Sequence, residues 1–482
     1  MVKNKKSLKC LSVGWDPFLI KDILQNVEKK TDIRFLHALT SDATRLAAVQ
    51  EQYPELKLIS LGKKKFEQLP KPNYTLLGQL ESAGVPTVRS MIQGDPYLRS
   101  LPERKSLGYA TLIAQNLKNV FEKYKPKFVL ASNDRLHSAM ALAVAKSLNI
   151  PFVVLAFPVI PDNLTGFLNA LTPNSLVPIV RPVTNAIRQE ALSLIQSVRL
   201  KRQIVQAYKA PFLWSEYVLK ILSHINNLIG RLKSDNLAGL DEYSSPSLQT
   251  SAYNIGRRLI NRICLPVADM ITIPPRKRYA YYPLHMAPES MLDTWAPFYQ
   301  NQLSFAAQVA LAIPSDMEFV VKLHFSDPDN YNRQELKKLM LMPGLRIAHP
   351  TSSGRAFLEQ AALVVGITGT SCLEAALLGK PVLIFGDSPY QHFPRTERAK
   401  RPDELHEQIN NLLQKPKPTK PQLINAYSAY LSRYMPGRIN DWSKPIKEKE
   451  AERLVDCFRA LSVFLRKPIN IKNWYKQSPF QA

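Results

Sequence analysis

Ala361–Gly386, AALVVGITGTSCLEAALLGKPVLIFG, carries the clearest structural signal in the chain. Leu363–Val365 is a short apolar run of the kind buried in a parallel sheet, and Val382–Phe385 is a second one. Apolar residues between the two runs recur at helical spacing. Gly379 followed closely by Pro381 is typical of the end of a helix. The stretch therefore predicts a strand, a Gly-rich turn, a helix, a second turn and a second strand.

The turn before the predicted helix gathers most of the polar groups of this unit: Thr368, Gly369, Thr370 and Ser371. Free N–H groups and the positive end of a helix dipole would lie there, and they suit the phosphates of a nucleotide. Glu374 follows about one helical turn further on, near enough to accept hydrogen bonds from a ribose. A purely structural alternative stays open, in which Gly and Thr shape a turn and Glu374 lies on a solvated helix face.

Several motifs resemble the bacterial capsule polysaccharide biosynthesis family of GT-B glycosyltransferases. The Gly-Thr, Glu-Ala and Gly-Lys-Pro segments of the stretch above resemble the donor-nucleotide domain of that family. Tyr281–Glu289, YYPLHMAPE, is similar to its aromatic-Pro-Leu-His-x-x-Pro-Glu segment, and Gln302 and Leu311–Pro314 follow in the family's order. The family usually reads Lys-Glu-His-Pro where this chain has Lys322-Leu323-His324-Phe325. Together with Ala156–Asp162 and Gly166–Ala170, the matches span roughly residues 125 to 395.

The resemblance implies an α/β, GT-B-like fold, with two Rossmann-like domains facing a central cleft and a helical insertion. We expect an N-terminal acceptor-side domain over 1–184 and a basic helical insertion over 185–275. A C-terminal donor domain over 276–414 would follow, and then a linker and C-terminal helices over 415–482 that pack back on the N-terminal domain. Strands are predicted at 8–14, 33–36, 127–131 and 151–155, and residues 415–421, with three prolines, are predicted as a loop.

Each candidate residue has a role that the chemistry of sugar transfer suggests. Thr368 to Ser371 would hold phosphate, and Lys322 and His324 would neutralise it from a strand end. His349, Ser352 and Ser353 are further candidate donor contacts, with an ordinary loop histidine as the alternative for His349. Glu289 is the candidate for acid–base or sugar-orienting work, with His285 as its rival and a structural helix cap as the alternative. Asn133 and Asp134, after a predicted strand, are acceptor-side candidates or helix caps.

Composition limits the class of protein and its partners. The chain has 482 residues, four scattered cysteines without metal-ligand spacing and a formal net charge of +25. We therefore expect reduced thiols, no metal site and no Asp-x-Asp-type metal dependence. An acidic glycan or an anionic membrane surface would balance the charge, whereas nucleic acid is not expected, because no zinc-finger, RNA-binding or dense basic tract is present. Tyr217–Leu222 is a candidate membrane contact, or part of a solvated helical insertion.

The N-terminal apolar run is too short for a signal sequence, and no stretch approaches the roughly 18 apolar residues of a membrane span. We therefore expect a cytoplasmic enzyme, peripheral on the inner face of the cytoplasmic membrane. The family implies transfer of a sugar, such as Kdo from a CMP-activated donor or another from a UDP-linked one, to a lipid-linked or growing glycan, with no cofactor beyond the nucleotide sugar. Two alternatives stay open: a sugar-nucleotide epimerase, and a non-catalytic scaffold of a polysaccharide assembly or export complex.

Overall fold

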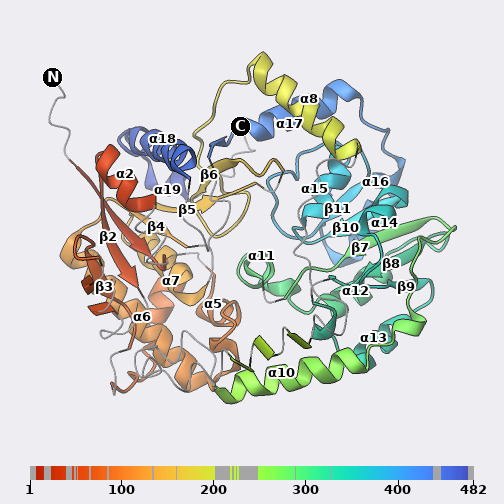
Figure 1. Cartoon of the computed structure of the whole chain (residues 1–482), viewed down its shortest axis with the longest axis horizontal. Helices are drawn as coiled ribbons and strands as arrows, with labels where there is room; N and C mark the ends of the chain where they lie inside the picture. Colours follow the sequence, from red (N-terminus) through yellow and green to blue (C-terminus); the bar gives the residue numbers. More distant parts are fainter. Residues whose placement is uncertain are drawn as a thin grey trace. The chain divides into compact units, whose positions relative to one another are not determined.

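The computed structural model (Figure 1) divides by its internal contacts into two compact units. Unit 1 contains Met1–Arg181, Arg231–Pro246 and Arg433–Ala482, and unit 2 contains Pro182–Gly230 and Ser247–Ser432. The structure describes residues 7–15, 23–39, 46–47, 50–51, 53–63, 67–83, 86–132, 135–158, 160–200, 218–219, 222–223, 225–226, 248–287, 289–325, 327–437 and 447–475. The domain boundaries expected at 184, 275 and 414 stay predictions.

Unit 1 is built on a seven-stranded sheet with helices on both faces. The strands, from edge to edge, are β13 (Met435–Pro436), β6 (Leu164–Leu168), β5 (Phe152–Ala156), β4 (Phe128–Ala131), β1 (Leu8–Val13), β2 (Ile33–Leu39) and β3 (Leu58–Ser60). Strand β6 pairs in the antiparallel sense with both of its neighbours, β5 and β13, and the other pairs are parallel. The helices are α2 (Gln25–Lys30), α4 (Tyr74–Glu81), α5 (Val88–Gln93), α6 (Glu103–Tyr124), α7 (Arg135–Ser147), α18 (Glu448–Leu465) and α19 (Ile471–Trp474). Figure 1 shows α2 and α18 on one face, and α6 and α7 on the other.

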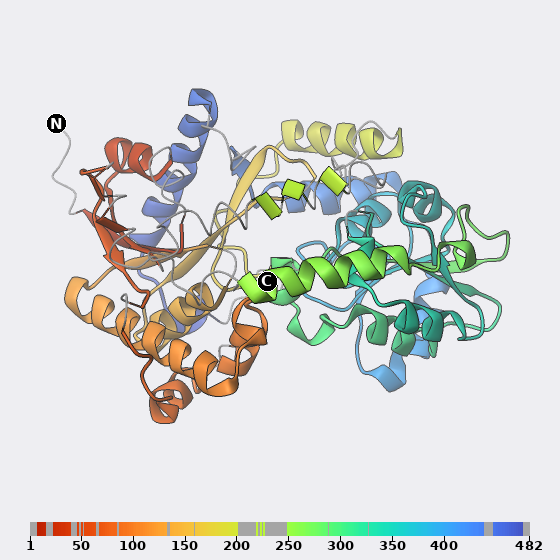
Figure 2. The same cartoon turned by 60° about the horizontal axis from the view of Figure 1, so that its bottom comes forward.

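Unit 2 contains a six-stranded sheet in which every pair is parallel. Its strands, from edge to edge, are β12 (Thr396–Arg398), β11 (Val382–Ile384), β10 (Leu363–Gly366), β7 (Tyr279–Pro283), β8 (Glu318–Lys322) and β9 (Leu345–Ala348). Its helices are α8 (Asn185–Arg199), α10 (Leu248–Ile263), α11 (Ser290–Asp293), α12 (Gln302–Ala310), α13 (Arg333–Met340), α14 (Gly354–Gln360), α15 (Thr370–Leu377), α16 (Leu405–Gln414) and α17 (Lys420–Leu431). Helix α8 packs on α17, and α10, the long green helix of Figure 2, packs on the turn at Pro328–Asn330.

Both sheets have the strand order of a Rossmann fold. In unit 2 the chain runs outward from β7 through β8 to β9, then returns to the other side of β7 and runs outward from β10 to β12. Unit 1 repeats this order about β1 and β4. The predicted fold class, α/β with two Rossmann-like domains, is therefore confirmed. Ligands of such sheets bind beyond the carboxyl ends of the strands where the order reverses. In unit 2 this switch point lies between β7 and β10.

The predicted strand–helix–strand stretch forms as expected. Strands β10 and β11 pair in parallel, with Val364 opposite Val382, and α15 connects them. Gly379 has a φ of +74°, which favours glycine, and its N–H donates to the carbonyl of Ala376 at 2.9 Å. The N–H of Lys380 donates to the carbonyl of Ala375 at 3.0 Å, which completes the capping pattern at the end of the helix.

Successive side chains of β7 point to opposite faces of the sheet and pack on helices there. This packing holds in place the strand that leads to the switch point. Tyr281 stacks on Phe357 of α14 with ring centroids 6.0 Å apart, whereas Tyr282 meets Phe305 of α12 at 5.5 Å. Such pairs contribute about 0.5–1.5 kcal/mol each beyond their area burial. Both tyrosines are almost fully buried. Packing on both faces therefore fixes where β7 ends.

One expected loop is shorter than the sequence indicated. Residues 415–419 are not helical, but α17 begins at Lys420, so Pro421 lies in its first turn, where proline is tolerated. Thr419 and Gln422 form a capping box, a signal that the loop prediction overlooked. Of the predicted membrane contact at Tyr217–Leu222, the structure describes Val218, Leu219 and Leu222, which are exposed, and the other three residues lie outside the described part. Of the described helices, none is both long and apolar enough to cross a membrane.

Candidate functional site

The candidate site of unit 2 lies at its switch point. His285 follows β7, Lys322 ends β8, and Thr368 and Gly369 follow β10. Because these strands are parallel neighbours, their carboxyl ends lie along one edge of the sheet. Residues predicted from separate motifs are therefore brought together by the strand order.

Helix α15 presents its N-terminus at this edge. Its N-cap residue, Gly369, provides no side-chain hydrogen bond, so the first N–H groups of the helix, at Thr370 and Ser371, have no side-chain cap. The Gly369 carbonyl accepts a hydrogen bond from the Tyr390 hydroxyl at 2.7 Å, which holds the turn in place. Thr368 is buried, and its Oγ1 atom has no hydrogen-bond partner within the described part of the chain. These groups together form an unpaired donor set of the kind that binds phosphate.

His285 is held rigidly by its backbone. Its N–H donates to Gln302 Oε1 at 2.7 Å, and its carbonyl accepts from Gln302 Nε2 at 3.0 Å. Gln302 Nε2 also donates to the Tyr331 hydroxyl at 3.1 Å. All three residues are buried. The side chain of His285 therefore starts from a fixed position.

The His285 ring lies between Glu289 and the start of α15. Its Nδ1 atom is 3.3 Å from Glu289 Oε2, and its Nε2 atom is 3.4 Å from where a Cβ atom on Gly369 would lie. A carboxylate oxygen can accept a hydrogen bond from an imidazole N–H, which assigns the donor role in this contact to Nδ1. Nε2 therefore faces the α15 N-terminus. His285 and Glu289, which the sequence set against each other as rivals, form one pair.

Lys322 is a buried cation held by backbone carbonyls. Its Nζ atom donates to the carbonyls of Pro350 at 2.8 Å, His349 at 3.3 Å and Leu323 at 3.4 Å. The residue is 7% exposed, and burial lowers the pKa of its ammonium to about 8. No ion pair joins Lys322 to any carboxylate of the described residues. A buried, unpaired ammonium attracts an anion strongly because the local dielectric is low.

His324 lies close to the same group and carries no charge at neutral pH. Its pKa falls to about 4, first because of burial and then because His285 and Lys322 repel a second positive charge, whereas Glu289 opposes the shift. The ring lies 4.7 Å from that of Phe325. A neutral imidazole still offers one N–H, so the phosphate role predicted for His324 would be that of a hydrogen-bond donor.

The loop after β9 contributes to the site mainly through its backbone carbonyls, and less through its side chains. His349 Nδ1 is 2.7 Å from Thr351 Oγ1, and the Ser352 hydroxyl donates to the His349 carbonyl at 2.6 Å. The Ser353 hydroxyl caps α14. Burial and the nearby Lys322 lower the pKa of His349. The predicted serines thus shape the loop whose carbonyls hold Lys322.

Glu374, the predicted ribose acceptor, forms an ion pair that the sequence did not indicate. Its Oε2 atom lies 3.3 Å from Arg355 Nη1, and Arg355 also binds Glu359 at 2.9 Å and the Val198 carbonyl at 2.8 Å. Burial raises the pKa of Glu374, and Arg355 opposes that rise. Arg355 therefore ties α14, α15 and the end of α8 together, and a ribose would bind a carboxylate that is already oriented.

The acceptor-side candidates of unit 1, Asn133 and Asp134, lie outside the described residues. Their described neighbours form a polar group at the switch point of that unit. The Ser132 and Ser138 hydroxyls lie 2.8 Å apart, and Ser132 Oγ is 3.5 Å from His137 Nε2. Burial lowers the pKa of His137 to about 3, so its ring is neutral.

Sequence motifs did not reveal a second interaction that holds the site in place, because the two residues that form it are far apart in the chain. Arg258 of α10 lies 2.9 Å from Asp327 Oδ1, and Asp327 Oδ2 accepts the N–H of Ala287 at 3.0 Å. Burial raises the pKa of Asp327 to about 6, although Arg258 opposes the shift. The pair fixes the segment between His285 and Glu289. Across the described residues, no group of three His, Cys, Asp or Glu side chains is placed to hold a metal ion.

Comparison of the sequence with protein-family models and with curated proteins finds no match. The beta Kdo 2,7 transferase KpsC of Thermosulfurimonas dismutans is 12% identical to this chain, with a TM-score of 0.36 over 72% of this chain and 90% of that chain. The UDP-GlcNAc 2-epimerase of Methanocaldococcus jannaschii is 12% identical, with a TM-score of 0.26 over 88% and 97%. The spinosyn forosaminyltransferase SpnP is 12% identical, with a TM-score of 0.26 over 95% and 100%. We therefore base the functional proposal on the residues of this chain.

Proposed function

We propose that this chain is a GT-B-type glycosyltransferase that binds its nucleotide-sugar donor at the switch point of unit 2. One observation carries the proposal: the N-terminus of α15, which has no side-chain cap, lies at the same edge of the sheet as the buried ammonium of Lys322 and next to the ring of His285. For a leaving phosphate, the helix supplies the positive end of its dipole, Lys322 supplies a positive charge, and His285 supplies a proton donor.

The residues divide the work as follows. The N–H groups of Thr370 and Ser371 and the Lys322 ammonium would bind the donor phosphate and stabilise the charge that it gains when the glycosidic bond breaks. His285, held through Nδ1 by Glu289, would donate from Nε2 to the departing phosphate when its ring is protonated. Glu374 would hold the ribose. The transfer would need no metal ion, since these donors already balance the phosphate charge.

The finer proposal concerns the substrates. The resemblance to the capsule polysaccharide family, together with a net charge of +25, supports an anionic donor such as a CMP-linked acidic sugar of the Kdo type. The same charge supports an acidic glycan or lipid-linked acceptor at the inner face of the cytoplasmic membrane. The product would extend a surface polysaccharide.

The test is a thermal-shift titration of the full chain with CMP, UDP, CDP and GDP, without metal. Thr370 is the first residue of α15, so Thr370→Pro removes one N–H donor and leaves the helix able to form, while Thr370→Ala keeps that N–H and serves as the control. We expect one nucleotide to stabilise the chain and the control. Losing one hydrogen bond to a charged group, about 1.5–3 kcal/mol, should weaken binding to Thr370→Pro by roughly 10- to 100-fold.

Three results would contradict the proposal. Equal shifts for Thr370→Pro and Thr370→Ala would place the nucleotide elsewhere. Absence of a shift with every nucleotide would favour the scaffold, and turnover of a free sugar nucleotide without an acceptor would favour the epimerase. Incorporation of sugar from the stabilising nucleotide into a glycan acceptor would distinguish the transferase from both.

A further inference from the structure

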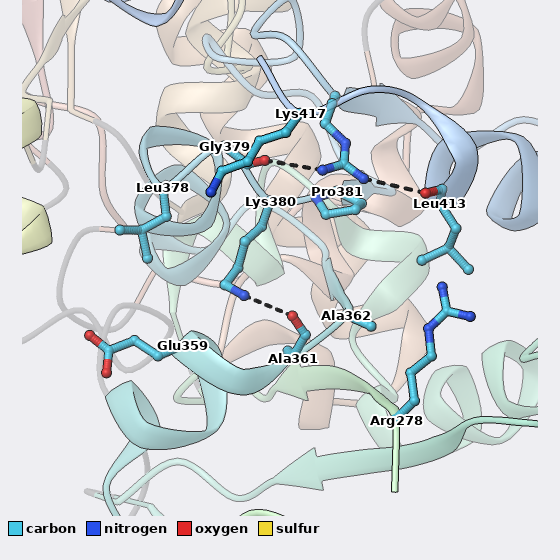
Figure 3. Close-up of a pocket in the computed structure, with 11 residues that line it drawn as sticks. Arg278, Glu359, Ala361, Ala362, Leu378, Gly379, Lys380, Pro381, Leu413 and Lys417 are labelled. Carbon is cyan, nitrogen blue, oxygen red and sulfur yellow. Dashed lines mark hydrogen bonds between the residues drawn. The ribbon is translucent and has the colours of Figure 1, made fainter. Parts of the chain in front are cut away.

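A pocket of about 430 Å³ lies at the opposite edge of the unit 2 sheet (Figure 3). Its lining residues directly precede strands: Arg278 precedes β7, Ala362 precedes β10, Pro381 precedes β11, and Arg395 precedes β12. It therefore lies at the amino edge, whereas the switch point lies at the carboxyl edge. The four residues of β10 separate the two edges by about 13 Å.

Positive charge dominates this amino-edge pocket. Four of its lining residues are cations, Arg278, Lys380, Arg395 and Lys417, and one is a carboxylate, Glu359. Glu359 is already bound to Arg355 at 2.9 Å, and Arg278 lies 3.1 Å from Asp316. The remaining three cations have no carboxylate partner among the ion pairs of the described residues. The residues between them are small or apolar, such as the alanines and Gly379, which leave the hollow open.

Two of the cations are held in position by backbone carbonyls. Lys380 Nζ donates to the Ala361 carbonyl at 2.8 Å, and Figure 3 shows its side chain reaching across the hollow to that atom. Arg395 donates to the carbonyls of Gly379 and Leu413, each at 3.4 Å. Its Nε atom is buried and has no hydrogen-bond partner in the described part of the chain. Preorganised cations with an unused donor are typical of an anion site.

Repulsion between the cations is visible at Lys380. Its pKa is lowered first by burial and then by Lys417, Arg395 and Arg355, and only Glu359 opposes the shift. Bringing a negative group into the pocket would relieve both the burial of charge and this repulsion. The volume lies within the range of small-molecule sites, which is about 300–1,000 Å³.

We propose that the amino-edge pocket binds a phosphate-bearing anion, at a site separate from the nucleotide site at the switch point. The phosphate would lie between Lys380, Arg395 and Lys417. It could belong to a free phosphorylated small molecule or to the headgroup of an anionic phospholipid, and both offer the same chemistry to these three side chains. The site would thus take a second anionic ligand.

The test uses isothermal titration of the full chain with inorganic pyrophosphate, with Lys417→Glu as the test variant. Lys417 is exposed in a non-helical loop, so its replacement should leave the fold intact. Lys420→Glu is the matched control: it makes the same charge change three residues away, outside the pocket lining, in the first turn of α17, where an acid is favourable. Thr370→Pro is the second control: if pyrophosphate binds at the switch point and not in the amino-edge pocket, this variant should lose the binding. Sedimentation with phosphatidylcholine vesicles, with or without phosphatidylglycerol, tests the headgroup source.

We expect Lys417→Glu to weaken binding at least fivefold, while Lys420→Glu and Thr370→Pro retain that binding event. If the effect appears with pyrophosphate, the ligand is a free phosphate compound. If it appears only with phosphatidylglycerol vesicles, the ligand is a lipid headgroup. Equal losses in Lys417→Glu and Lys420→Glu, or unchanged binding of both ligands by Lys417→Glu, would overturn the proposal.

Discussion

Replacing Lys322 by methionine should stabilise the unliganded protein and remove its affinity for nucleotide. Lys322 is 7% exposed and donates its hydrogen bonds to carbonyls rather than to a carboxylate. A methionine side chain has a similar shape and needs no hydration. A residue that weakens the fold and yet is required for binding is expected at a functional site.

The magnitude follows from the pKa of Lys322. Lowering that pKa from 10.5 to about 8 makes the charged amine about 3 kcal/mol less stable in the folded chain than in the unfolded one. Methionine removes this penalty but loses three hydrogen bonds to carbonyls. The one to Pro350, at 2.8 Å, is worth about 1 kcal/mol, and the longer ones to His349 and Leu323 are worth about 1 kcal/mol together. The net gain is about 1 kcal/mol, or roughly 1–2 °C in melting temperature for a chain of 482 residues.

The assay is chemical unfolding across pH, with and without nucleotide. Between pH 8 and pH 10.5 the unfolded chain holds the Lys322 proton while the folded chain has released it, so the free energy of unfolding of the wild type rises through this window. Lys322→Met should lack that rise. Nucleotide affinity of the wild type should be constant below about pH 8 and fall above it, because the ammonium is the binding form. The matched control is Lys338→Met, at an exposed position of α13.

Three outcomes would refute this reasoning: lower stability of Lys322→Met at neutral pH, an equal rise in the variant between pH 8 and pH 10.5, and wild-type nucleotide affinity in the variant. The first would show that the carbonyl bonds outweigh the burial of charge. The second would assign the rise to another group. The third would remove Lys322 from the site.

Two further substitutions test how the site is held. Gln302→Leu leaves the buried N–H of His285 unpaired and its carbonyl with only the Tyr331 hydroxyl at 3.5 Å, so we expect the free energy of unfolding, measured in urea, to fall by about 1–3 kcal/mol. Gln302→Glu keeps an acceptor for that N–H and should lose less. Glu374→Gln keeps an oxygen for Arg355 but loses the negative charge. Calorimetry should therefore show weaker binding of CMP or UDP, which have a ribose, and unchanged binding of pyrophosphate, which has none. An equal loss of affinity for the nucleotide and for pyrophosphate would contradict the ribose role.

The elements that depend on local pattern were predictable from the sequence. The buried strands at 128–131 and 152–156 and the strand–helix–strand stretch after Ala361 have short apolar runs with clear boundaries. Cys372, in the same stretch, is fully buried, and burial raises the pKa of its thiol to about 12, so it packs as a small side chain. In these segments the chemistry of neighbouring residues in the chain decides the structure.

The contacts that orient the site were not predictable, because they join residues far apart in the chain. Arg258 and Asp327 are separated by 69 positions and meet through packing of α10. Arg355 reaches the end of α8, 157 positions away. The partners of Lys322 are carbonyls, and any residue has one, so no side-chain pattern marks them. Sequence motifs therefore identify the residue types of a site better than the bonds that hold them.

The two edges of the unit 2 sheet offer anions different kinds of binding. At the carboxyl edge, N–H groups fixed by α15 and one buried ammonium have directions set by the backbone, so a ligand is selected by its geometry. At the amino edge, three side-chain cations surround a hollow, and Lys417 is exposed. Exposed charges are screened by salt far more than buried ones. Binding at the amino edge should therefore depend steeply on ionic strength and little on ligand shape, as suits a site that recognises charge rather than a particular nucleotide.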